Sequence, residues 1–204
     1  MLRNLFFLSH TYPEGGEPAD SVTGDDGGDE KSKKNLFECR FLLALCEYLL
    51  GHGTYTAEDI VILTAYNGQM LQFVAEKKNR PALHGIRIAV IDNYQGEESK
   101  IVLLSLVRSG STNGATDTIG FLAHENRICV ALSRARDGLY IVGNMTLLAK
   151  CSKTWSSIER KLRDQAAIGA SMPLQCVTHG QTVEVKMPED FGELKEVRCI
   201  CGML

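Results

Sequence analysis

Short apolar runs rich in β-branched residues alternate along the chain with segments whose apolar residues recur at helical spacing. The runs at 60–63 and 101–107 are apolar almost throughout, which is typical of strands that are buried on both faces. Between such runs lie helix-like segments such as 35–50, which is followed by a glycine, Gly51. Strands that alternate with helices at this spacing predict an α/β fold, with a parallel sheet covered by helices on both faces.

The same pattern gives a set of expected elements and one long irregular segment. The expected strands are 5–8, 60–63, 86–91, 101–107 and 139–142, and the expected helices are 35–50, 68–79, 124–135 and 156–167. Ser156 and Glu159 predict a capping box at the start of the last helix. Residues 11–34 are rich in Gly, Asp and Glu and contain no basic residue before Lys31. This composition predicts a mobile acidic surface loop, and a regulatory or partner-binding loop is the alternative.

Length and charge limit the classes of protein that remain. The 204 residues suit one domain, expected at 1–168, with a small appendage at 169–204. Contents of 44% hydrophobic and 23% charged residues exclude a fibrous or wholly disordered chain. The net charge of −3 means that any binding to nucleic acid needs a local basic patch. The sequence shows no secretory signal and no membrane span, which predicts an intracellular protein, cytoplasmic or nuclear.

Polar and aromatic side chains gather around the ends of the expected strands, where parallel sheets bind their ligands. The segments are Thr-Ala-Tyr-Asn-Gly-Gln at 64–69, Asp-Asn-Tyr-Gln-Gly-Glu-Glu at 92–98, Arg108, and Asn-Arg-Ile-Cys-Val-Ala-Leu-Ser-Arg-Ala-Arg at 126–136. We expect them to form one polar edge, which packing alone does not require. Arg134 and Arg136 cannot share a helix face, so one can meet a ligand while the other pairs with an acid. On spacing alone, surface salt bridges remain the alternative for these arginines.

In this order, and together with Leu-Ser-Leu-Val-Arg-Ser at 104–109 and Ile-Gly-Phe-Leu at 119–122, the motifs resemble the second RecA-like domain of superfamily 1 helicases. More narrowly, they resemble the group that contains the nonsense-mediated-decay helicase and its relatives with NF-X-type zinc fingers. The resemblance covers about residues 5–162 and implies a RecA-like fold of the P-loop NTPase type. Five motifs in the right order are more specific than any one of them.

The resemblance also implies two ligand sites. In similar helicases the arginine at Arg134 acts as an arginine finger, which reaches across a cleft to the γ-phosphate of ATP bound with Mg²⁺. The positions that match the nucleotide site are Gln95, Gly96, Glu98, Arg134 and Arg136. The positions that match a channel for single-stranded RNA or DNA are Thr64, Tyr66, Gln69, Asp92, Tyr94 and Arg108.

Parts of a working ATPase of this type are missing from the sequence. No phosphate loop of the form G-x-x-x-x-G-K-[ST] occurs, and the Asp-Glu pair that holds Mg²⁺ in relatives belongs to a first RecA-like domain. Glu97 stands where several relatives carry Arg. We therefore expect the C-terminal motor domain of a longer helicase, which needs a first RecA-like domain as partner and hydrolyses no ATP alone. The alternative is a non-catalytic module that keeps the fold and binds RNA or a protein.

Cysteine and histidine residues near the end of the chain form a candidate zinc site. Cys176 and His179 are followed by Cys199 and Cys201, and four such groups can coordinate zinc tetrahedrally. On spacing alone, unligated cysteines are the alternative. The segment resembles the opening of an NF-X-type zinc finger, which predicts a short, truncated zinc-finger-like tail. The other four cysteines lie in apolar runs and are expected to be reduced thiols of the core.

Overall fold

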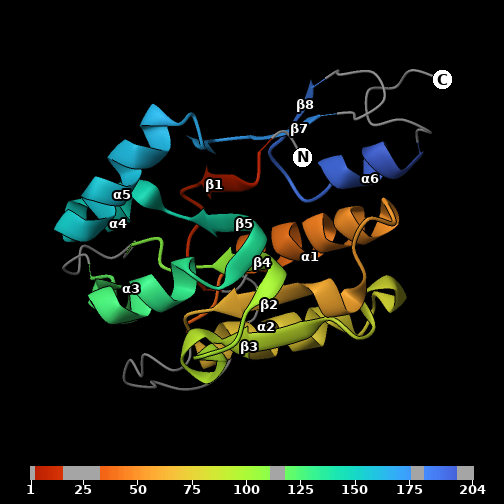
Figure 1. Ribbon diagram of the computed structural model, residues 1–204, viewed down its shortest axis with the longest axis horizontal. Helices are drawn as coiled ribbons and strands as arrows, with labels where there is room; N and C mark the ends of the chain where they lie inside the picture. The colour runs from red at the N-terminus through yellow and green to blue at the C-terminus, as the bar shows by residue number, and fades with distance from the viewer. Residues whose placement is uncertain (1–2, 16–32, 111–117, 176–181, 197–204) are drawn as a thin grey trace.

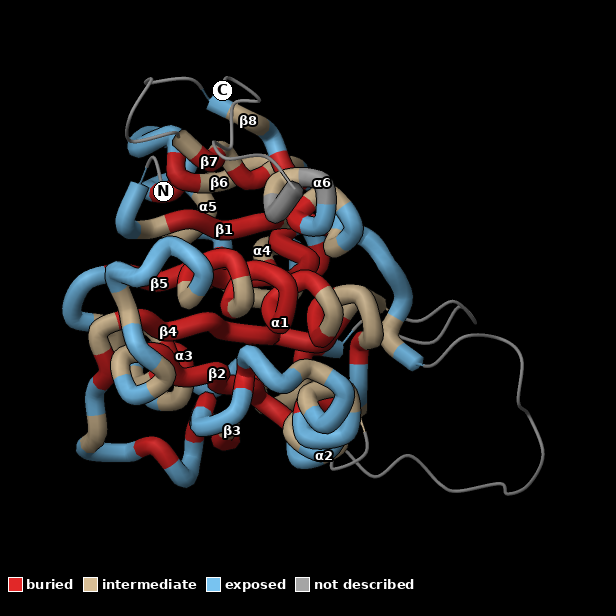
Figure 2. The backbone as a smooth tube through the Cα atoms, turned by 90° about the vertical axis from the view of Figure 1, so that its right-hand side faces the viewer, coloured by how far each residue is buried: buried red, intermediate tan, exposed pale blue. Residues whose placement is uncertain are grey.

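A six-stranded parallel sheet forms the centre of the protein in the computed structural model, which describes residues 3–15, 33–110, 118–175 and 182–196. In space the strands follow the order β3-β2-β4-β5-β1-β6, from the bottom to the top of Figure 2. The strands are β1 (Leu5–Ser9), β2 (Ile60–Thr64), β3 (Arg87–Val90), β4 (Ser99–Ser105), β5 (Ala135–Gly143) and β6 (Ile168–Gly169). All of their pairings are parallel, which confirms the prediction.

Helices cover both faces of this sheet, as predicted. On one face lie α1 (Leu36–Gly51) and α2 (Asn67–Lys77), and on the other, to the left in Figure 1, lie α3 (Glu125–Leu132), α4 (Met145–Cys151) and α5 (Lys153–Asp164). Short 3₁₀ turns lie in the connections: η2 (Ala57–Asp59), η3 (Pro81–Leu83), η4 (Ile91–Tyr94) and η5 (Gly120–Ala123). Among the described residues, no helix is long and apolar enough to cross a membrane.

Two hydrophobic cores, one on each face, arise because successive side chains of a strand point to opposite faces. In β2, Ile60 and Ile62 pack in the core that contains α1, whereas Val61 and Leu63 pack in the core that contains α3 and α5. All four side chains are 1% exposed or less. This two-sided burial explains why the strand is apolar at every position instead of alternating between apolar and polar residues.

Some element boundaries differ from the predicted ones. β5 begins at Ala135, because α3 already ends at Leu132 and the chain turns directly into the strand. α5 begins three residues earlier than expected, because its N-cap is Ser152, whose hydroxyl accepts a hydrogen bond from the Trp155 N–H at 3.4 Å. The capping box predicted at Ser156 is therefore wrong. α4 and β6 were not expected, since both are too short to show a clear period.

The described part of the tail packs against the α1 side of the sheet. β7 (Met172–Gln175) and β8 (Thr182–Val185) pair in antiparallel fashion, and α6 (Asp190–Glu196) follows them. The ring of Phe191 in α6 lies edge-on to Phe41 in α1, with 5.3 Å between the ring centroids. This part of the tail thus shares the core of the main domain.

The predicted zinc ligands Cys176, His179, Cys199 and Cys201 all lie outside the described residues. Within the ranges that the structure covers, no group of three or more His, Cys, Asp or Glu side chains could hold a metal ion. The zinc-finger-like tail therefore stays a prediction. Most of the predicted acidic loop, residues 16–32, is likewise outside the described part.

The remaining four cysteines only partly follow the prediction of core thiols. Cys39 and Cys46 of α1 are fully buried, and burial raises the pKa of both thiols, to about 12 for Cys46. Cys151 is half-buried, and Cys129 is exposed on α3. The prediction is wrong for Cys129, because this short helix carries it on the side away from the sheet.

Candidate functional site

The predicted ligand-binding residues lie at two opposite edges of the sheet, and the expectation of one polar edge is wrong. Thr64 pairs with Ser105 where β2 and β4 end, and this is the carboxyl edge. Ser99 pairs with Ala135 where β4 and β5 begin, and this is the amino edge. The two predicted nucleotide motifs come directly before these strand starts and therefore lie at the amino edge.

The connections that lead into β4 and β5 explain this separation. A parallel strand is entered from the amino edge, so a chain that leaves the preceding strand at the carboxyl edge must cross back over the sheet. η4 begins such a crossing after β3, and residues 95–98 complete it, while α3 makes the same crossing before β5. The nucleotide candidates Gln95, Gly96, Glu98 and Arg134 are the last residues of these crossings, and Arg136 is the second residue of β5. Most nucleic-acid candidates directly follow strand ends and stay at the carboxyl edge.

At the amino edge, Arg134 is held in place by neutral oxygen atoms. Its Nε donates to the Val130 carbonyl at 3.0 Å, its Nη1 to the Glu97 carbonyl at 3.2 Å, and its Nη2 to the Ser133 hydroxyl at 2.8 Å. Within the described residues it forms no ion pair with a carboxylate. The half-buried guanidinium of Arg134 thus has a fixed position and a charge that no acid of the described chain neutralises.

The acids beside Arg134 are paired with other arginines. Glu98 accepts a hydrogen bond of 3.4 Å from Arg136, and both side chains are mostly exposed. Glu97 and Arg87 form a two-pronged ion pair, with 2.7 Å between Arg87 Nη2 and Glu97 Oε1, and this partner lowers the pKa of Glu97. Because Glu97 is occupied by Arg87, the charge of Arg134 stays available.

Tyr94, a predicted nucleic-acid contact, lies beneath the Arg87 side chain. The Arg87 Cζ atom is 4.9 Å from the centre of the tyrosine ring, and Tyr94 is only 3% exposed. Burial raises the pKa of its hydroxyl. In this structure Tyr94 therefore supports the amino edge, and its contact with nucleic acid stays a prediction.

Gly96, in the nucleotide motif, has a backbone conformation that only glycine adopts freely. Its φ is +81°, and no heavy atom lies within 4 Å of the position where a Cβ atom would stand. The open space beside the Gly96 backbone is consistent with a ligand that approaches the chain closely there.

Replacing Gly96 with alanine is expected to lower the free energy of unfolding by about 1–2 kcal/mol, because the left-handed backbone is strained for a residue with a Cβ atom. Urea unfolding measures this loss. Gly51→Ala is the matched control, since Gly51 is the last residue of α1, also has free space, and lacks a positive φ. A loss of the same size in both variants would contradict the conformational explanation.

At the carboxyl edge, Gln69 is a buried structural residue in this structure. Its amide exchanges two hydrogen bonds with the Asn35 backbone: the Asn35 N–H donates at 2.7 Å, and Gln69 Nε2 donates to the Asn35 carbonyl at 3.0 Å. Nε2 also donates to the Ser105 hydroxyl at 3.1 Å. Gln69 and Thr64 are both fully buried, so neither offers surface to a nucleic-acid strand here.

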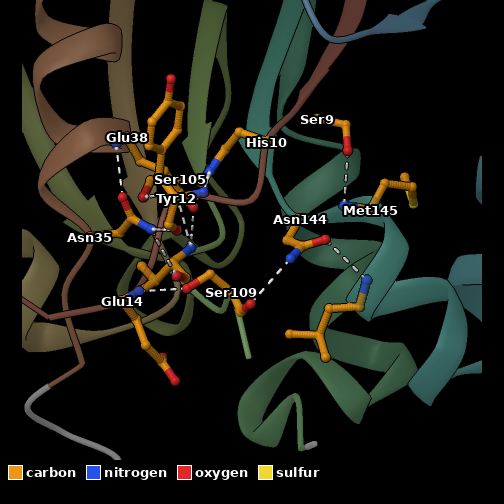
Figure 3. A network of polar contacts seen from close by, with 12 residues as sticks. Ser9, His10, Tyr12, Glu14, Asn35, Glu38, Ser105, Ser109, Asn144 and Met145 are labelled. Carbon is orange, nitrogen blue, oxygen red and sulfur yellow. Dashed lines mark hydrogen bonds and ion pairs between the residues drawn. The ribbon is translucent and has the colours of Figure 1, made fainter. Parts of the chain in front are cut away.

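A buried carboxylate, Glu38, links the start of α1 to the end of β4 (Figure 3). It accepts hydrogen bonds from the Ser105 hydroxyl at 2.6 Å, the Val107 N–H at 2.9 Å and the His10 ring at 3.1 Å. Glu38 is not among the residues predicted from the sequence. The available signal was Asn35 three residues earlier, which caps α1 by accepting from the Glu38 N–H at 3.1 Å.

Arg108 and Tyr66, two further predicted nucleic-acid contacts, are bound within the chain. Arg108 Nε lies 3.1 Å from a carboxylate oxygen of Glu14, and the arginine side chain is 9% exposed. The Tyr66 hydroxyl donates to the Ile119 carbonyl at 3.3 Å. Both residues follow strand ends at the carboxyl edge, but each would have to exchange a partner to bind a strand directly.

Comparison with known proteins places the chain among helicases and helicase-like proteins. A family model described as an AAA domain matches residues 6–146. The human "NFX1-type zinc finger-containing protein 1" is 41% identical over 199 residues, which are 96% of this chain and 9% of that protein. The "Helicase required for RNAi-mediated heterochromatin assembly 1" of Schizosaccharomyces pombe is 37% identical over 190 residues, 91% of this chain and 17% of that protein. The "Regulator of nonsense transcripts 1 homolog" of Drosophila melanogaster is 37% identical over 116 residues, 54% of this chain and 9% of that protein.

Proposed function

Because this chain belongs to the superfamily 1 helicases, in the group of the nonsense-mediated-decay helicase and the NFX1-type zinc-finger proteins, we propose that it is the C-terminal motor domain of an ATP-dependent RNA or DNA helicase. In this proposal the chain supplies the arginine finger and one wall of the single-strand channel. A first RecA-like domain supplies the phosphate loop and the acids that hold Mg²⁺.

The observation that carries the proposal is the environment of Arg134. A guanidinium that acts on a transferring phosphoryl group must be fixed in space and must keep its charge. The three neutral acceptors of Arg134 fix it, and the neighbouring acids Glu97 and Glu98 are paired with Arg87 and Arg136 instead. An arginine that served only as a surface salt bridge would have an acid as its partner.

The amino edge suits the polyphosphate of ATP for two further reasons. Gly96 leaves its backbone uncovered, and Arg136 is mostly exposed, so both can face a ligand bound between two domains. ATP with Mg²⁺ would supply the phosphoryl group whose developing charge Arg134 stabilises. In the proposal Gln95 and Glu98 complete the nucleotide contacts.

At the carboxyl edge we propose that Asp92 lines the path of the single strand, and that the buried residues Arg108 and Tyr66 reach the strand by exchanging their partners, Glu14 and the Ile119 carbonyl. Thr64 and Gln69 act from beneath, because their buried side chains hold the turn that carries Tyr66. Contacts of this kind go mostly to phosphate and sugar, so the proposed binding depends little on sequence.

The test is to join the chain to a first RecA-like domain from an NFX1-type relative and to measure ATP turnover with and without single-stranded RNA. We expect turnover that the strand stimulates, and none from either part alone. A joined protein that folds but hydrolyses no ATP, and still binds RNA, would favour a non-catalytic binding module and overturn the motor assignment.

A further inference from the structure

An arginine and a phenylalanine are stacked on one another beside the carboxyl edge. Phe121 lies in η5 and Arg127 in the first half of α3, and the Arg127 Cζ atom is 4.2 Å from the centre of the phenylalanine ring. The Arg127 Nη2 atom is also 3.3 Å from a carboxylate oxygen of Asp92, which follows β3. The guanidinium is thus held from below by the ring and from one side by the acid.

This stack is continuous with the surface already proposed to meet a single strand. The Phe121 ring centre is 6.1 Å from that of Tyr66, the aromatic residue that follows β2. The Tyr66 hydroxyl binds the Ile119 carbonyl, two residues before Phe121. Thr118, in the same segment, accepts a hydrogen bond of 3.4 Å from Arg108. A strand that passed Arg108 and Tyr66 would reach the stack next.

The Arg127 side chain of this stack is partly exposed to solvent. The Arg127 side chain is 40% exposed although one face of its guanidinium covers Phe121 and one edge binds Asp92. Because one face of the guanidinium lies over Phe121 and one edge meets Asp92, the second face is the one that a ligand could use. Planar guanidinium groups and aromatic rings are the surfaces on which unpaired bases stack.

The charge of the cluster favours a base over a phosphate as its ligand. Asp92 offsets the positive charge of Arg127, so the pair as a whole attracts a phosphate only weakly. Stacking depends on the planar guanidinium, whose orientation Asp92 and Phe121 fix. We infer that Arg127, backed by Phe121 and positioned by Asp92, is a platform for one unpaired base of a single-stranded nucleic acid. This inference rests on the proposed function and adds to it a base-binding position.

The test introduces Arg127→Lys into the joined two-domain protein and compares it with the joined protein without substitutions, because lysine keeps the positive charge but lacks the plane. Affinity is measured for a single-stranded oligonucleotide and for an abasic strand of the same length and charge. We expect the variant to bind the normal strand about tenfold more weakly, in the range that one base stack contributes, and to bind the abasic strand unchanged. Phe121→Leu should show the same selective loss.

Arg163→Lys is the matched control, since Arg163 of α5 forms an exposed ion pair with Glu159 away from the carboxyl edge. It should change neither affinity. If Arg127→Lys weakens both strands equally or neither, the platform is wrong while the proposed channel stands. If the joined protein without substitutions binds neither strand, the proposed channel at this edge fails and the platform fails with it.

Discussion

Replacing Arg134 with alanine is expected to slow ATP turnover by the joined two-domain protein about 10³–10⁵-fold, the range that an arginine finger contributes in related NTPases. The loss follows from the removal of a fixed, un-neutralised guanidinium at the amino edge. The measurement is the steady-state rate at saturating ATP and RNA. RNA affinity should stay the same, because Arg134 lies at the edge opposite the proposed channel.

Two further variants separate the loss of the finger from a general loss of charge. Arg134→Lys should recover only a small part of the rate, since lysine cannot reproduce the planar, forked donor. Arg163→Ala removes a positive charge from α5 and should leave the rate unchanged. Normal ATP turnover by Arg134→Ala would show that Arg134 is not an arginine finger, even though the chain belongs to the superfamily 1 helicases.

The amino edge differs from the carboxyl edge in one arginine, Arg134. Arg108 is paired with Glu14 and Arg127 with Asp92, so the carboxyl edge carries balanced charges among the described residues. Arg134 at the amino edge has only neutral acceptors. A site for phosphoryl transfer needs its charge ready before the ligand arrives, because rearrangement during the reaction adds to the barrier. A surface that binds a moving strand can instead exchange one partner for another.

The sequence was sufficient to predict the layered fold because the signal is local and repeated. In β2, four consecutive apolar residues indicate burial on both faces, and the helical segments on either side of it in the sequence supply the two layers that cover it. The motifs were also found from the sequence, since each is a short continuous segment. The division of these motifs between the two edges of the sheet was not predicted, because it depends on which way each connection crosses the sheet.

The buried polar residues show a second limit of the sequence. Gln69 belongs to a motif that resembles a nucleic-acid contact, yet its amide is bonded to Asn35 and Ser105, which are distant in sequence. Glu38 lies within an apolar helix and would ordinarily be assigned to an exposed face. Neither role can be seen until the fold brings the end of β4 next to the start of α1. The periodicity of a sequence indicates which residues are buried, but not which residues they contact.

Glu38→Ala is expected to lower the free energy of unfolding by about 3–5 kcal/mol, as found when one member of a buried ionic or polar group is removed. The variant leaves the Ser105 hydroxyl, the Val107 N–H and His10 without their acceptor in a fully buried region. Urea unfolding measures the loss. Glu58→Ala, at an exposed position in η2, should change the unfolding free energy by less than about 0.5 kcal/mol.

The backbone conformation of Val107 gives a second reason to expect that Glu38→Ala lowers stability. Its φ of +71° is strained for a β-branched residue, and both Glu38 oxygens accept from its N–H. Without Glu38, Val107 is expected to relax and to move Arg108, the next residue, away from Glu14. Glu38→Gln should lose less stability than Glu38→Ala, because one oxygen remains as an acceptor. If Glu38→Ala unfolds at the same urea concentration as the unchanged chain, this network does not hold the carboxyl edge, and the position of Arg108 depends on Glu14 alone.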